Sequence, residues 1–93
     1  MIKLNGKEYQ FTYSFTQLDE LMEKTGIELS GLQTIVKTFK HIPLICSIGT
    51  GMSEEEVRKI LDEGNFLDVN EIIEAFTKEV GRYFDPNKTS QAQ

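Results

Sequence analysis

Residues 2–13 read IKLNGKEYQFTY, in which Asn5-Gly6 separates two segments of alternating apolar and polar side chains. Asn-Gly is the preferred pair for a two-residue type I′ turn, so this stretch predicts a β-hairpin. The register pairs Ile2 with Tyr9, Lys3 with Glu8 and Leu4 with Lys7, and it gathers Ile2, Leu4, Tyr9, Phe11 and Tyr13 on one face. Since a lone hairpin is marginal in water, we expect this one to pack on helices or to gain a further strand.

After the hairpin the hydrophobic period changes from two to three and four, which indicates helices. Ser14 and Gln17 fit a capping box and Gly26 fits a left-handed stop, so a first helix of about ten residues is predicted between them. A second helical run is predicted from Ser30, with Leu32, Ile35, Val36 and Phe39 as its apolar side chains. Pro43 should break or kink this run near His41 and Ile42, because proline disfavours helical geometry in the residue before it.

The second half of the chain predicts three more helices. A short buried helix should run from Pro43 to Ile48 and end at Gly49-Thr50-Gly51. Ser53 with Glu56 predicts the start of another helix, which ends at Gly64. Asp68 with Glu71 predicts the cap of the last helix, whose apolar stripe comprises Val69, Ile72, Ile73, Phe76, Val80, Tyr83 and Phe84.

These elements predict an α+β fold, with an N-terminal β-hairpin packed on a mostly helical bundle of four to five short helices. We expect one domain over residues 1–84, because 93 residues suit a single core. Asp85-Pro86-Asn87 should end the last helix, and residues 85–93 form a polar tail that we expect to be disordered.

Charge and cysteine content narrow the function classes. Ten basic and fifteen acidic residues give a formal net charge of −5, without a cluster of lysine and arginine, so neither nucleic acid nor an anionic membrane is an expected partner. No apolar run approaches the roughly 18 residues that a membrane span needs. The single cysteine, Cys46, lies in an apolar run, which predicts an inert core thiol and a reducing compartment such as the cytoplasm.

The residues that could carry catalysis are few. His41 and Cys46 are the only histidine and the only cysteine, and their positions around Pro43 give them no reason to meet. A zinc site would need about four nitrogen or sulfur ligands, and consecutive acids such as those at 54–56 point 100° apart along a helix and cannot converge on one ion. The sequence therefore predicts a protein that is not an enzyme and binds no metal or cofactor.

The order of these motifs resembles the tail assembly chaperones of long-tailed phages and prophages. The resemblance covers about residues 1–84. The motifs that carry it are Asn5-Gly6-Lys7-Glu8-Tyr9, then Phe11, Phe15, Leu18, Leu21, Glu23, Lys24, Thr25, Gly26 and Leu29, then Ser53 to Val57 and Asn70 to Phe76. The chain departs from the family's commoner pattern at Pro43 and at the connector 49–51.

This resemblance implies a non-catalytic function. Family members are implied to bind the hydrophobic tape measure protein and keep it soluble until the tail tube assembles around it. We therefore expect the tape measure protein as partner, the bacterial host cytoplasm as location, and self-association as a further option. The alternatives are a small tail structural subunit or another prophage protein-interaction module.

Two surfaces are expected to meet a partner. Either strand of the hairpin could offer a free edge to an added strand, with Lys3, Glu8, Gln10 and Thr12 near it. The stripe of the last helix could also exceed what a small core covers, which would leave Val80, Tyr83 and Phe84 for another chain. A shielded edge and a stripe used fully by the core are the competing interpretations.

Overall fold

The computed structural model describes the backbone of residues 1–84 and the side chains of residues 1–83. Its elements in chain order are β1 (Ile2–Leu4), β2 (Lys7–Tyr9), α1 (Phe15–Thr25), the 3-10 turns η1 (Leu29–Gly31), η2 (Ile35–Lys37) and η3 (Phe39–His41), α2 (Ile42–Thr50), α3 (Glu54–Glu63) and α4 (Phe66–Phe84). The predicted α+β fold, a hairpin followed by a helical bundle, is confirmed. The predicted tail at 85–93 lies outside the described residues.

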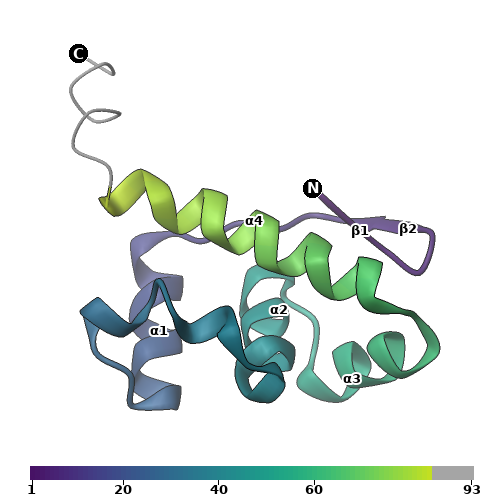
Figure 1. The fold of residues 1–93 in the computed structure, drawn as a ribbon, viewed down its shortest axis with the longest axis horizontal. Helices are drawn as coiled ribbons and strands as arrows, with labels where there is room; N and C mark the ends of the chain where they lie inside the picture. Colours follow the sequence, from purple (N-terminus) through teal and green to yellow (C-terminus); the bar gives the residue numbers. More distant parts are fainter. Residues whose placement is uncertain (85–93) are drawn as a thin grey trace.

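The helices form two layers around one core (Figure 1). Helices α1, α2 and α3 lie side by side, and α2 in the middle packs against both neighbours and against α4. Helix α4 crosses this row, and β1 packs along the N-terminal half of α4. The core lies between these layers, and its largest fully buried side chains include Tyr13, Phe76, Ile2, Leu4 and Leu21.

The hairpin has the predicted turn and register. Asn5 and Gly6 have φ angles of 51° and 82°, as both central residues of a type I′ turn require. Ile2 pairs with Tyr9, Lys3 with Glu8 and Leu4 with Lys7. The apolar face of β1 lies against the core, where Ile2 and Leu4 are both buried.

Helix α1 begins and ends at the predicted residues. Ser14 caps it: the Ser14 hydroxyl accepts the Gln17 N–H at 3.2 Å, while the Gln17 side chain accepts the Ser14 N–H at 2.8 Å. Gly26 follows the helix with φ of 72°, and its N–H donates to the carbonyl of Met22.

The predicted second helix from Ser30 to Phe39 is wrong. Three separate 3-10 turns occupy this segment, and Thr38 between the last two is extended, with φ of −128° and ψ of 160°. A run of β-branched residues from 34 to 36 lowers helix propensity, and the Thr34 hydroxyl bonds the Gly31 carbonyl at 3.1 Å. Leu32 and Ile35 are nevertheless buried, so two anchors hold an irregular segment on the core.

Helix α2 starts where Pro43 predicts a break, at Ile42, but it runs beyond the predicted end. Gly49 and Thr50 are helical, and Gly51, with φ of 85°, follows the last turn. A Cβ at Gly49 would lie only 2.5 Å from Cε2 of Phe11, so this glycine lets the Phe11 ring pack directly on the helix backbone. The glycine pair that indicated a turn therefore has two functions, close packing at Gly49 and termination at Gly51.

Helix α3 has the predicted Ser53 cap and ends before Gly64. Helix α4, however, begins at Phe66 rather than after Asp68, so the predicted cap is wrong. Asn65 is the cap: its side chain accepts the Leu67 N–H at 2.8 Å, and the Asp68 carboxylate accepts the Asn65 N–H at 3.1 Å. A side chain at Gly64 would collide with Asp68, so Gly64 makes this arrangement possible.

Candidate functional site: the interaction surfaces

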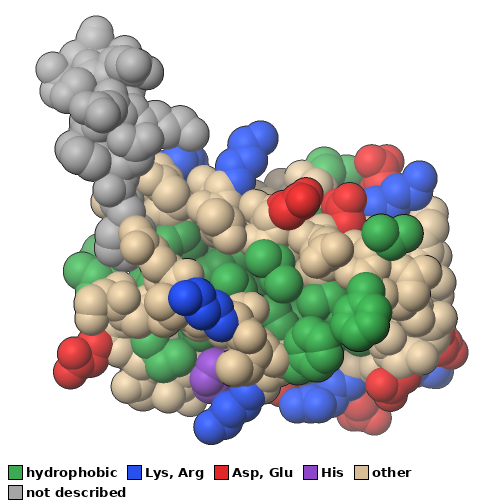
Figure 2. Space-filling view, viewed as in Figure 1, with side chains coloured by type: hydrophobic (Ala, Val, Ile, Leu, Met, Phe, Trp, Pro, Cys, Tyr) green, Lys and Arg blue, Asp and Glu red, His purple; other side chains and the backbone are tan. Residues whose placement is uncertain are grey.

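An apolar hollow in the described surface lies between η3, α2, α3 and the start of α4. Its volume is about 530 Å³, and we call it the Phe39–Phe66 groove. Its lining comprises Phe39, Ile42, Pro43, Arg58, Leu61, Asp62, Asn65, Phe66 and Val69. Figure 2 shows hydrophobic side chains gathered on this face, below the N-terminal half of α4.

Two phenylalanines dominate the rim of the Phe39–Phe66 groove. Phe39 is 63% exposed and Phe66 is 70% exposed, and their ring centroids are 5.9 Å apart. Solvent-exposed aromatic side chains around an apolar floor are typical of surfaces that bind another macromolecule. Arg58 and Asp62 on α3 supply one charge of each sign at the border.

The sequence has one signal for this groove, which is the spacing of Phe66 and Val69. Phe66 lies three residues before Val69 and extends the stripe of α4 by one turn beyond the core. Phe39 is one of the apolar side chains of the segment that the sequence predicts to be helical. Because the segment forms 3-10 turns, Phe39 points to solvent, beside Phe66.

The expectation of a free edge on β1 is wrong, because carboxylates of α4 occupy it. The outward backbone N–H of Lys3 donates to Glu71 Oε2 at 3.3 Å, and that of Asn5 donates to Asp68 Oδ1 at 2.9 Å. Asp68 is only 8% exposed, so this contact lies partly within the protein. An added strand would have to displace both carboxylates to pair with β1.

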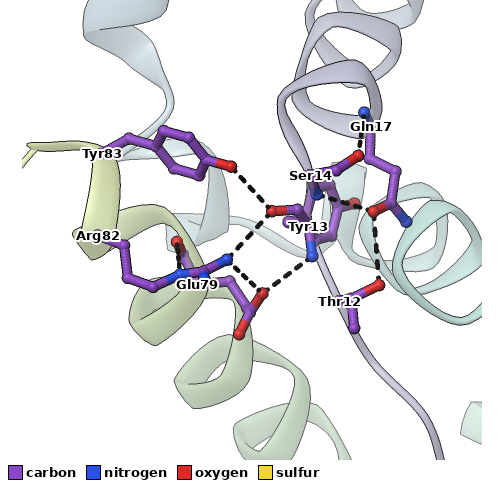
Figure 3. Close-up of polar contacts among 7 residues, drawn as sticks. All are labelled: Thr12, Tyr13, Ser14, Gln17, Glu79, Arg82 and Tyr83. Atoms are coloured by element: carbon purple, nitrogen blue, oxygen red, sulfur yellow. Dashed lines mark hydrogen bonds and ion pairs between the residues drawn. The ribbon is translucent and has the colours of Figure 1, made fainter.

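A third carboxylate of α4 contacts the chain just after the hairpin (Figure 3). Glu79 accepts the backbone N–H of Tyr13 at 3.0 Å and the guanidinium of Arg82 at 3.0 Å. Tyr83 donates its hydroxyl to the Tyr13 carbonyl at 3.5 Å. The Tyr13 ring itself is buried, donates its hydroxyl to the Ile45 carbonyl at 2.6 Å and packs edge-on against Phe76.

The remaining predicted contact residues near the hairpin lie on the surface. The side chains of Lys3, Glu8, Gln10 and Thr12 are all exposed. The Thr12 N–H, however, already donates to the carbonyl of Gly49 at 3.0 Å, so the backbone there is held by α2. Contact of these side chains with a partner stays a prediction, and the outer edge of β2 is the part of the hairpin that could still offer it.

On α4 the structure separates the three predicted contact residues. Val80 is 3% exposed and belongs to the core, so the expectation that it is left for another chain is wrong. Tyr83 is 48% exposed and lines a second groove beside α1. The side chain of Phe84 lies outside the described residues.

Cys46 occupies the core, as the sequence predicts. Burial raises the pKa of its thiol to about 12, against a weaker opposite effect of the hydrogen bond with Thr50. A thiol with this pKa stays protonated at neutral pH and is a poor nucleophile. Burial likewise raises the pKa of the Tyr13 phenol, with smaller contributions from Cys46 and Glu20.

Among the described residues no three His, Cys, Asp or Glu side chains gather closely enough to hold a metal ion. None of the described helices combines the length and the apolar character that crossing a membrane requires.

Comparison with protein-family models, with curated proteins and with solved structures finds no match to this chain.

Proposed function

We propose that this chain is a non-catalytic tail assembly chaperone of a phage or prophage, which binds the tape measure protein in the host cytoplasm and keeps it soluble. The Phe39–Phe66 groove is the observation that carries this proposal. It offers two exposed aromatic rings and an apolar floor on a domain of only 93 residues.

The chemistry of the groove suits a holding function. An apolar helix of a client can pack its side chains against the Phe39 and Phe66 rings and the floor of the groove, and thereby remove them from water. A hollow of about 530 Å³ accommodates several side chains at once, and aromatic rings of this kind are frequent anchors of binding energy. Release of the client requires no covalent step, because burial of apolar surface alone holds it.

Net charge supports the same function. A protein that exposes apolar surface aggregates unless its charge keeps copies apart, and this chain has a formal charge of −5. The exposed first turn of α3, with three consecutive glutamates, adds negative charge to the surface. The complex of chaperone and client would remain soluble for the same reason.

Co-expression with the tape measure protein of the same phage or prophage tests the proposal. The double variant Phe39→Ser/Phe66→Ser removes both rings of the groove, while Leu67→Ser removes an equally exposed side chain that faces away from it. We expect the wild-type chain and Leu67→Ser to hold the tape measure protein in the soluble fraction and to co-purify with it. The double variant should do neither, although its circular dichroism remains that of the wild type.

Two results would count against the proposal. If the tape measure protein stays insoluble beside a folded wild-type chain, this chain is not its chaperone. Recovery of the chain from mature particles would instead favour the small tail structural subunit.

A further inference from the structure

A second apolar groove lies at the other end of the molecule, between α1, η1 and the last turn of α4. We call it the α1 groove; its volume is about 400 Å³, and its lining comprises Phe15, Leu18, Asp19, Met22, Leu29, Leu32 and Tyr83. Leu18 and Leu32 form a buried floor, whereas Phe15 and Leu29 are exposed at the border.

The α1 groove has the shape of a slot along a helix. Phe15, Leu18 and Met22 follow one another at spacings of three and four residues, so they form one row on α1. A rise of about 1.5 Å per residue makes this row about 10 Å long, which is two turns of a facing helix. Tyr83 closes the opposite side; its hydroxyl reaches the Tyr13 carbonyl and the Arg82 guanidinium lies 5.8 Å from its ring centroid, so the ring is held in place (Figure 3).

The unpaired charges beside this slot are acidic, since Arg82, which lies near the Tyr83 ring, is paired with Glu79 at 3.0 Å. Asp19 lines the groove, Glu23 lies one turn further along the same side of α1, and Glu28 precedes the exposed Leu29. Within the described residues none of these three acids has a salt-bridge partner, whereas Glu20 on the neighbouring side is paired with Lys24 at 3.0 Å. The apolar slot is therefore bordered by unneutralised negative charge.

The apolar slot and its acidic border together indicate what kind of segment the α1 groove binds. We propose that the α1 groove binds an amphipathic helix of another protein, with apolar side chains on one face and lysine or arginine beside them. The apolar face fills the slot, and the basic side chains meet Asp19, Glu23 and Glu28. Residues 85–93 of this chain contain no large hydrophobic side chain and cannot fill the slot, and a second copy with a net charge of −5 is repelled by the acidic border.

The α1 groove and the Phe39–Phe66 groove are lined by different residues, so this inference does not rest on the proposed function. It is tested with two fluorescent peptides of about 18 residues, long enough to form a helix. Both carry the same leucines on one face; one has lysines on the polar face and the other has glutamates. Neither peptide contains tape measure sequence, so failure here is distinguishable from failure of the chaperone proposal.

Fluorescence anisotropy with the full chain should show about tenfold tighter binding of the lysine peptide, and the preference should shrink in high salt. The charge reversal Asp19→Lys/Glu23→Lys should invert the preference, because these exposed side chains set the sign of the border. Leu29→Ser, which removes apolar contact without adding charge, should weaken binding of both peptides. Phe39→Ser, in the other groove, should leave the affinity for the lysine peptide unchanged.

Equal affinity for both peptides, or a preference that survives the charge reversal, would overturn the inference. Sedimentation gives an independent check: if the wild-type chain self-associates and Leu29→Ser makes it monomeric, a second copy occupies the groove and the proposed occupant is wrong. Circular dichroism of every variant must match the wild type before its affinity is compared.

Discussion

The N-terminal seam, residues 1–14 against α2 and α4, differs sharply from the segment at 29–41. In the seam, Ile2, Leu4, Phe11 and Tyr13 are buried, and three carboxylates of α4 accept backbone N–H groups. In the segment, only Leu32 and Ile35 are buried, the backbone forms three separate turns, and Leu29 and Phe39 point to solvent. The first region is closely packed on the helices, whereas the second lines part of both apolar grooves.

This difference shows what apolar periodicity means in a small domain. Both regions have regular apolar patterns, yet only the seam also has a turn pair and a cap that agree with its pattern. The segment has helical spacing without a capping box, and β-branched residues weaken its helix propensity. Where local signals disagree, the pattern predicts which residues reach the core but not the backbone that carries them.

Truncation of one phenylalanine in each region should show the largest difference between the two regions. Phe11→Ala should cost about 3–5 kcal/mol, because Phe11 is 4% exposed and packs on the backbone of α2. Phe39→Ala should change stability by less than about 0.5 kcal/mol, because its ring is mostly in water. Urea unfolding followed by circular dichroism measures both, and similar costs would show that the segment is packed as tightly as the seam.

A methyl group at Gly49 probes the closeness of the seam. Gly49→Ala should destabilise the protein by about 1–3 kcal/mol, since the new Cβ would push the Phe11 ring away from α2. Gly81→Ala is the matched control: this glycine is also helical but has no atom near a new Cβ, so alanine should be neutral or stabilise by up to about 1 kcal/mol. Equal effects in thermal unfolding would contradict the close approach.

Removal of one carboxylate tests the polar part of the seam. Asp68→Ala leaves the N–H groups of Asn5 and Asn65 without their acceptor and should cost about 1–3 kcal/mol. Glu74→Ala, an exposed acid on the same helix, should stay within about 0.5 kcal/mol of the wild type. Faster hydrogen exchange at Asn5 in the Asp68 variant alone would confirm the contact, and unchanged exchange would refute it.

Alkaline pH should weaken the core beside the seam by a smaller amount. The unfolded Cys46 thiol loses its proton near pH 9.0, whereas in the fold its pKa is raised to about 12, so the unfolded state gains stability as pH rises above 9. Between about pH 9 and pH 10 the free energy of unfolding should fall by about 1 kcal/mol, and Tyr13, whose pKa is also raised, acts in the same direction at higher pH.

Cys46→Ala serves as the control for this titration. The variant starts from a lower stability because it leaves a small cavity, but its stability should decline less steeply across the same pH range. An identical slope in both proteins would show that the thiol does not contribute.

Local sequence signals were sufficient for much of the fold. The Asn5-Gly6 turn, the register of the hairpin, the caps of α1 and α3 and the break at Pro43 were all predictable, because each depends on neighbouring residues and on backbone geometry. The core position of Cys46 followed in the same way from its apolar neighbours.

Contacts between distant residues settled the rest. Gly49 lies within α2, where the ring of Phe11, 38 positions away, packs against it. The edge of β1 is covered because Glu71 and Asp68 reach it from α4. Phe39 and Phe66 become one surface only when an irregular segment places their rings 5.9 Å apart. A turn or a cap is a short-range preference that the sequence states directly, whereas a groove or a covered edge depends on how separate elements meet when the core is packed.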